Sequence, residues 1–161
     1  MPDKAREIVI INAPVQACFD RLVDFESYPA WAGDLKQAVV VGRDGEGRAE
    51  VVEFRAAAMG RSTTYRLRYD YEGAPHRLAW VLESGDLERE LDGAYQLREA
   101  EGDPRSTEVV YELSVDLVLP IPGFVKRRAE ARILKTALAD LKALIEGTGG
   151  STATSTSESA S

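Results

Sequence analysis

Few residues of this chain have types and spacing suited to catalysis. The chain contains one histidine and one cysteine, too few for the usual zinc sites, and its carboxylates show no metal-ligand spacing. His76 lies in a turn without a positioned partner, and Cys18 lies on the apolar stripe of a predicted helix, where a thiol is normally inert. No dinucleotide-binding glycine loop or Gly-x-Ser-x-Gly motif is present. We therefore expect no metal and no cofactor, and we assign no catalytic residue.

A second group of residues suits ligand binding. Large aromatic and aliphatic side chains recur at alternate positions of successive predicted strands, so they share one face of a sheet. Tyrosines in such a set offer hydroxyl groups without unpaired buried charge, which favours a pocket over a simple core, the alternative interpretation. The candidate ligand-binding residues are Phe54, Tyr65, Leu67, Tyr69, Trp80, Leu82, Tyr95, Tyr111 and Leu113 from the strands, and Leu134 and Leu138 from the last helix.

Two basic features could add polar groups to this pocket. Arg89 shares the alternation phase of Tyr95 and could present a cation to a polar headgroup or an enolate, whereas an arginine that reaches water from a strand end is the alternative. Basic residues also gather between Lys126 and Lys135, where the start of a helix disfavours cations. This cluster suits an anionic ligand or transient membrane contact, and the alternative is a solvated face paired with Glu130.

The elements that position these residues begin at residues 14–31, PVQACFDRLVDFESYPAW. The helical spacing of Val15, Cys18, Phe19, Leu22 and Val23 predicts one amphipathic helix. Asn12 can cap its first turn. Because Pro29 disfavours helical backbone at the preceding residue, we expect the helix to break near Phe25–Ser27 and a second short helical turn at residues 31–35. Trp31 should help to close one end of the pocket.

Strands are predicted on both sides of this helical region. Residues 8–11 are a short apolar run, and six more stretches rich in β-branched and aromatic residues follow, separated by Gly, Asp and Pro turn signals. These stretches are roughly residues 36–43, 48–58, 62–72, 77–84, 88–99 and 106–119. Connections this short indicate an antiparallel meander, with one wet face and one covered face.

A long helix comes last. It follows Pro122 and Gly123, should end at Gly147, and carries an apolar face that can cover the sheet. The sequence therefore predicts an α+β fold, a seven-stranded curved antiparallel sheet wrapped around a long C-terminal helix, with two short helices between strands 1 and 2. We expect one domain at residues 1–147 and a disordered Gly/Ser/Thr tail at residues 148–161, which has little to bury.

Composition limits the kinds of partner that we expect the protein to bind. The net charge of −7 argues against nucleic acid, whose phosphates favour basic surfaces. No run approaches the roughly 18 apolar residues that span a bilayer, and a lone cysteine fits a reducing cytoplasm, so we expect a cytoplasmic protein. The oligomeric state is left open.

The chain resembles a known superfamily at residues 10–15 (IINAPV), 23–31 (VDFESYPAW) and 119–124 (LPIPGF). On these residues it is similar to the START-like (SRPBCC) superfamily, which includes polyketide cyclases and dehydrases, lipid transport proteins, plant Bet v 1-like proteins and coenzyme-Q-binding proteins. The resemblance implies a helix-grip fold with a hydrophobic cavity between the sheet and the long helix.

Two functions remain open at this point. The first is noncatalytic binding of a hydrophobic small molecule, such as a lipid, a quinone or a polyketide-like compound. The second is a polyketide aromatase/cyclase that assists aldol cyclisation and dehydration of a poly-β-ketone by orienting the chain and polarising its carbonyls. Because the sequence offers few inward polar groups besides tyrosines, we favour binding.

Overall fold

The computed structural model describes residues 4–58, 61–118 and 121–150. Within them one seven-stranded sheet is accompanied by helices at two places in the chain. The elements are β1 (Ala5–Ile11), α1 (Val15–Leu22), the 3-10 turn η1 (Phe25–Ser27), α2 (Tyr28–Trp31), β2 (Leu35–Arg43), β3 (Ala49–Ala58), β4 (Arg61–Asp70), β5 (Arg77–Gly85), β6 (Glu88–Ala100), β7 (Asp103–Leu117) and α3 (Gly123–Gly150).

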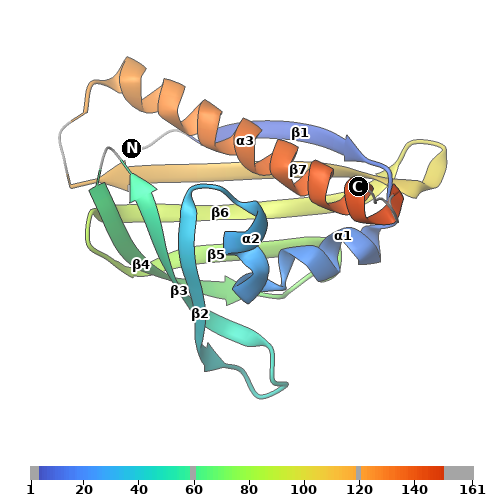
Figure 1. Cartoon of the computed structure of the whole chain (residues 1–161), viewed down its shortest axis with the longest axis horizontal. Helices are drawn as coiled ribbons and strands as arrows, with labels where there is room; N and C mark the ends of the chain where they lie inside the picture. Colours follow the sequence, from blue (N-terminus) through green and yellow to red (C-terminus); the bar gives the residue numbers. More distant parts are fainter. Residues whose placement is uncertain (1–3, 59–60, 119–120, 151–161) are drawn as a thin grey trace, which may run out of the picture.

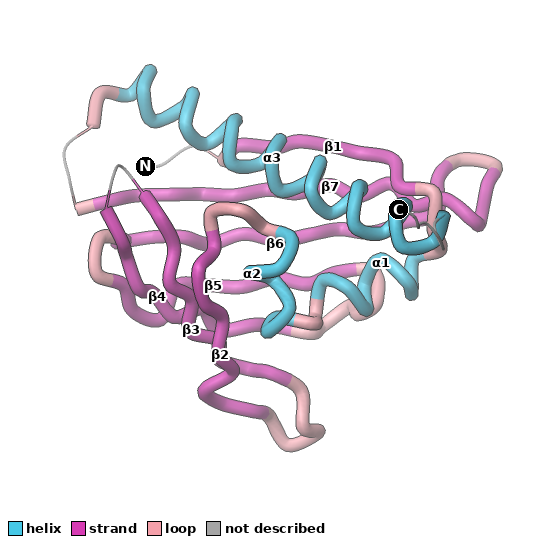
Figure 2. Tube along the Cα trace, in the orientation of Figure 1, coloured by secondary structure: helices cyan, strands magenta, loops and turns pink. Residues whose placement is uncertain are grey.

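The sheet has the order β1-β7-β6-β5-β4-β3-β2, and every neighbouring pair is antiparallel. Six strands form a meander, and β1 joins its far edge beside β7. Figure 1 shows α3 lying along β1 and β7, with α1 and α2 on the same side of the curved sheet. The tube in Figure 2 shows β2, β3 and β4 bending away from the direction of the other strands. The predicted helix-grip architecture is confirmed.

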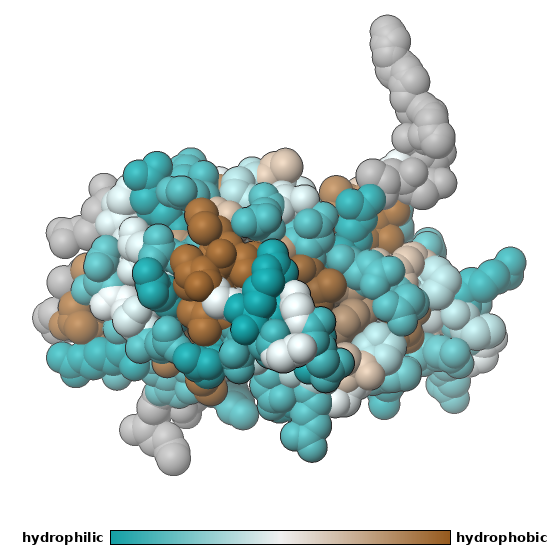
Figure 3. All heavy atoms as spheres, turned by 90° about the horizontal axis from the view of Figure 1, so that it is seen from below, coloured by the Kyte–Doolittle hydropathy of each residue, from teal (hydrophilic) through white to brown (hydrophobic). Residues whose placement is uncertain are grey.

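Side-chain alternation explains which face is covered. On β4, Leu67 and Tyr69 are buried, whereas Arg66 and Arg68 are exposed on the opposite face. Arg66 Nε lies 2.9 Å from a carboxylate oxygen of Glu53 on β3, so the wet face carries cross-strand ion pairs. The side of the molecule seen in Figure 3 is mainly hydrophilic, with a group of hydrophobic side chains within it.

The helix α3 covers the sheet through one apolar stripe. Leu134, Leu138, Leu141 and Ile145 are buried in the same core as Ile11 of β1. The C-terminal half is fixed by polar contacts as well, because Lys142 donates to the carbonyl of Ile10 at 2.6 Å. Among the described helices, none has the length and apolarity required to cross a bilayer.

The start of the helical region differs from the prediction. α1 begins after Pro14, and no side chain caps it. Asn12, predicted as the cap, instead accepts a hydrogen bond from the Ser106 hydroxyl at 3.2 Å and donates its backbone N–H to Glu146. These long-range partners compete with the local capping geometry.

The second short helix was also misplaced. It spans Tyr28–Trp31 rather than residues 31–35, and Tyr28 has helical backbone angles although a proline follows it. The Tyr28 side chain is buried, donates to the carbonyl of Leu22 and contacts the ring of Phe25, with ring centroids 5.5 Å apart. Tertiary packing thus overrides the preference that Pro29 imposes.

The remaining differences concern ends of elements. β1 starts at Ala5 because residues before the apolar run continue the ladder with β7, where Ala5 pairs with Leu113. α3 continues to Gly150 rather than ending at Gly147, although each glycine in a helix costs about 1 kcal/mol relative to alanine. Residues 119–120 and most of the predicted tail lie outside the described residues, so the tail stays a prediction.

Candidate ligand-binding cavity

A cavity of about 740 Å³ lies between the concave face of the sheet and α3, with α2 and the following loop on a third side. Its volume falls within the range of about 300–1,000 Å³ that is typical of small-molecule sites. Several wall residues are also exposed, including Gly33, Val118, Val125 and Ile133. These residues place the rim between the N-terminal half of α3 and the loop after α2.

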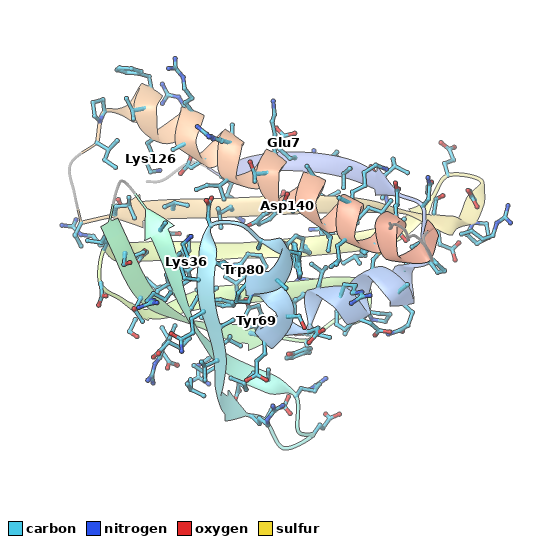
Figure 4. All side chains as sticks on the ribbon, in the orientation of Figure 1. Glu7, Lys36, Tyr69, Trp80, Lys126 and Asp140 are labelled. Atoms are coloured by element: carbon cyan, nitrogen blue, oxygen red, sulfur yellow. The ribbon has the colours of Figure 1, made fainter. Side chains whose placement is uncertain are left out.

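Most of the candidate residues from the strands line this cavity. They are Phe54, Tyr65, Leu67, Tyr69, Trp80, Tyr95, Tyr111 and Leu113. The aromatic rings form a continuous row across the sheet: ring centroids lie 5.8 Å apart between Tyr69 and Trp80, 5.3 Å between Trp80 and Tyr95, and 4.5 Å between Tyr95 and Tyr111. Tyr69 and Trp80 can be followed in Figure 4.

Trp80 owes its position to the absence of a side chain on the neighbouring strand. It pairs in register with Gly93 of β6, and a Cβ atom at Gly93 would lie 2.6 Å from Cζ2 of the indole. Real Cβ atoms do not approach this closely, so the glycine lets the ring pack close to the backbone of β6.

The corner formed by η1 and α2 closes one side of the cavity. Tyr28 and Trp31 both belong to the wall, with ring centroids 5.0 Å apart, and Phe25 joins this corner to Tyr69 at 4.4 Å. The indole nitrogen of Trp31 is buried and has no hydrogen-bond partner among the described residues. The Trp31 side chain thus lines the cavity at the place where a closing role was predicted.

The contribution of α3 comes from a different face than predicted. Leu134 and Leu138 are 0% and 3% exposed and belong to the core, not to the cavity wall. Each residue of a helix is rotated by about 100° from its neighbour, so the adjacent positions Ile133 and Ala137 line the cavity instead. Figure 4 shows Asp140, a further wall residue, projecting from the same helix.

Leu82 also lies outside the cavity wall. Its side chain is half-buried against the core, and its backbone N–H donates to Asp92 at 2.9 Å. The ladder between β4 and β5 shifts register beside Leu67, the partner of Leu82. This irregularity near the strand end interrupts the simple alternation on which the prediction depended.

A second irregularity brings an unpredicted carboxylate into the wall. The β6–β7 ladder shifts between Glu88 and Glu90, so Arg89 is the extra residue and Glu88 takes the inward position. Glu88 is 8% exposed, and the Thr63 hydroxyl lies 3.1 Å from each of its carboxylate oxygens. A Cβ atom at Gly85 would lie 2.6 Å from Glu88 Oε1, so a larger residue there would displace the carboxylate. The Gly85-Asp86 turn between the strands was the only sequence signal near this site.

Arg89 lines the cavity as predicted, but its side chain is exposed, which agrees with an arginine that reaches water. Nearby on α3, Lys126 Nζ lies 2.9 Å from Glu130, which is 3% exposed and also faces the cavity. This ion pair agrees with the alternative interpretation of the basic cluster, in which its residues pair with Glu130. Arg127 and Arg128 are exposed, and neither forms an ion pair within the described part of the chain.

Burial sets the protonation state of the tyrosines. Removal from water raises the pKa of Tyr65, Tyr69, Tyr95 and Tyr111 above the ordinary value of 10.0. All four are therefore neutral phenols at pH 7, able to donate a hydrogen bond and unable to act as bases.

Cys18 and His76, which we did not assign to catalysis from the sequence, lie outside the cavity wall. Cys18 is fully buried on the core-facing side of α1. Burial raises the pKa of its thiol, so the thiolate is disfavoured. His76 is exposed in the turn before β5. In the part of the chain that the structure describes, no group of three or more His, Cys, Asp and Glu residues could hold a metal ion.

Comparisons with known proteins agree with this architecture. Residues 3–146 match the family "Polyketide cyclase / dehydrase and lipid transport". A START superfamily protein from Mycobacterium smegmatis has a similar structure, with a TM-score of 0.84 and 21% identity over 90% of this chain and 98% of that one. The Zhui aromatase/cyclase from a Streptomyces species has a TM-score of 0.69 and 15% identity, covering 96% and 98% of the two chains. No curated protein matches the chain in sequence at a significant level.

Proposed function

Because the chain belongs to the polyketide cyclase/dehydrase and lipid transport family, we propose that it binds a hydrophobic small molecule in the cavity between the sheet and α3. The lipid, quinone and polyketide-like classes all fit a cavity of this size. We further propose a cytoplasmic location, on the grounds of the single buried cysteine.

The aromatic and aliphatic composition of the wall carries this proposal. The row from Tyr69 to Tyr111 and the apolar side chains of Leu113 and Ile133 present a large hydrophobic surface to one cavity. Transfer of apolar ligand surface from water to such a wall contributes about 25 cal/mol per Å². Neutral tyrosines can orient a carbonyl or hydroxyl group without a buried charge.

A polyketide aromatase/cyclase is the second candidate. The buried carboxylates Glu88 and Glu130 favour it, because either could accept a proton during an aldol closure. The neutral tyrosines could polarise a carbonyl in the enzyme or hold one in a binding protein, so they do not distinguish the two functions. The similarity to the Zhui enzyme, at 15% identity, supports a shared fold and not a shared reaction.

Native mass spectrometry of the protein purified from its own cells tests the binding function. We expect a complex with one hydrophobic molecule per chain, and titration with fatty acids, quinones and aromatic polyketides should identify its class. Wild-type protein that carries no molecule and binds no member of the panel would overturn the proposal.

The variant Tyr95→Phe separates binding from catalysis. It keeps the apolar wall and removes one hydroxyl, so binding should weaken by about 0.5–1.5 kcal/mol if that hydroxyl contacts the ligand. A cyclase would instead lose turnover of a poly-β-ketone mimic steeply, because the lost group would act in the transition state. Conversion of the mimic without a stable ligand complex would favour the enzyme.

A further inference from the structure

Two buried carboxylates belong to the cavity wall, one on the sheet and one on α3. Glu88 of β6 is 8% exposed and Glu130 of α3 is 3% exposed, and both belong to the cavity wall. An ionised carboxylate that leaves water loses several kcal/mol of hydration unless donors or cations replace it. The surroundings of each carboxylate therefore show what a ligand must supply.

Glu88 has donors but no cation. The Thr63 hydroxyl shares one proton between its two oxygens, and the backbone N–H of Leu87 donates to Oε1 at 3.2 Å. A carboxylate has about four acceptor positions, so at least one position remains open. Among the described residues, no lysine, arginine or histidine forms an ion pair with Glu88.

Glu130 forms an ion pair with Lys126, the one half-buried cation among the described wall residues. Lys126 Nζ lies 2.9 Å from its Oε2, yet this oxygen has no aligned hydrogen bond among the described residues. The other cationic wall residues, Arg89 and Arg132, are exposed at the rim and remain in water. The part of the wall around Glu88 and Glu130 thus has less positive than negative charge.

The cavity wall as a whole also carries more negative than positive charge. The buried and half-buried charged residues among the described wall residues are the carboxylates Glu88, Asp116, Glu130 and Asp140 and the cation Lys126. A ligand carboxylate would meet this excess of negative charge, and like charges brought together in a partly desolvated site repel by several kcal/mol. The tyrosines supply neutral donors, which do not neutralise a charge.

We infer that the cavity selects a hydrophobic ligand whose polar end donates hydrogen bonds, an amine or a hydroxyl group, over a ligand that ends in a carboxylate. The inference rests on the proposed binding function and specifies its ligand. A hydroxyl or ammonium group would donate to the open acceptor position of Glu88, and an ammonium group would also supply the missing counter-charge.

Three probes with the same alkyl chain test this preference: decylamine, decanol and decanoate, titrated at pH 7 with the fluorescence of Trp80 and Trp31 as the readout. We expect decylamine and decanol to bind at least about tenfold more tightly than decanoate. Decanoate binding as tightly as the other two would overturn the inference and leave the proposed function intact. Binding of none of the three, together with no binding of neutral quinones, would overturn the proposed function itself.

The variant Glu88→Gln locates the preference in the cavity. It keeps the size of the side chain beside Gly85 and removes its charge, so decylamine should lose about tenfold in affinity while decanol changes by less than about threefold. Glu90→Gln, at a position outside the wall, is the matched control and should leave all three affinities unchanged. Undiminished decylamine binding by Glu88→Gln would overturn the assignment. The wild-type series decides the preference even where Glu88→Gln does not fold.

Discussion

At the scale of single residues, the cavity depends on small side chains that make room for large ones. Gly93 leaves space for the indole of Trp80, and Gly85 leaves space for the carboxylate of Glu88. In both cases the missing Cβ lies on a strand next to the larger side chain, so the sheet can hold a bulky or charged group close to its backbone. The shape of the wall is therefore set partly by glycines that do not themselves contact a ligand.

The variant Gly93→Ala should destabilise the fold. The added methyl group would lie 2.6 Å from both the indole of Trp80 and the carbonyl oxygen of Glu112, so ring and backbone must both shift. Overpacking of this kind costs about 1–3 kcal/mol, which urea denaturation would measure. Gly45→Ala, in an open turn where nothing lies within 4 Å, is the control. Equal stability of the two variants would show that Trp80 is free to move.

A second residue-scale prediction concerns Trp31. Its ring packs on Tyr28 and lines the cavity, and removal of such a ring from a packed site costs about 3–5 kcal/mol. Because Trp31 is only partly buried, we expect Trp31→Ala to fall at the lower end of this range in thermal or urea unfolding. Stability within a few tenths of a kcal/mol of wild type would mean that the corner contributes no packing.

At the scale of elements, α3 is fixed at its C-terminal end by a small polar cluster. Glu146 accepts hydrogen bonds from Lys142 at 2.7 Å and from the backbone N–H of Asn12 at 2.8 Å. The hydrogen bond from Lys142, followed by that from Asn12, lowers the pKa of Glu146 from its ordinary value of 4.5. This cluster ties the end of the helix to the loop between β1 and α1, whereas the N-terminal half of α3 lies beside the cavity rim.

The lowered pKa makes this contact dependent on pH. A carboxyl whose pKa is lower in the folded state stabilises the fold above its unfolded pKa, near 4.5, and loses this contribution as pH falls through the folded value. Glu146→Gln should therefore be less stable than wild type at pH 7, and the difference should shrink below about pH 4. Urea midpoints across this range measure it, with Glu72→Gln, an exposed turn residue, as the control. A difference that does not depend on pH would contradict this role of Glu146.

Most elements, though not their finer placement, could be predicted from sequence, for identifiable physical reasons. Alternation along β4 predicted its buried face because Leu67 and Tyr69 both meet the core. The extra residue at Arg89 does not change the pattern of hydrophobic residues, so the sequence did not predict that Glu88 lines the cavity. On α3, periodicity revealed an apolar stripe but could not show that Leu134 packs on the sheet while Ile133 faces the cavity.

At the scale of the whole molecule, the sheet and α3 hold the cavity open between them. The core residues of α3 join those of β1 and β7 on one side, and the aromatic corner of η1 and α2 supports the other side. A cavity enclosed in this way costs stability unless something fills it, because its lining loses contacts. This cost is consistent with a structure maintained for a ligand.

Truncation tests the predicted extent of the domain. Residues after Gly147 supply no apolar face, so a chain that ends at Gly147 should melt within about 2 °C of the full-length protein. Differential scanning calorimetry of both proteins measures this. A larger loss of melting temperature would show that the C-terminal residues pack on the domain.

Filling the cavity tests the central claim most directly. Ala137 faces the cavity from α3, and Ala139 is exposed on the same helix outside the wall, so Ala137→Phe and Ala139→Phe add the same ring in two environments. In a titration with the neutral hydrophobic dye Nile red, Ala137→Phe should weaken binding by at least about tenfold, ~1.4 kcal/mol, while Ala139→Phe binds as wild type does. Equal binding by wild type and both variants would contradict the claim that this cavity is the ligand site.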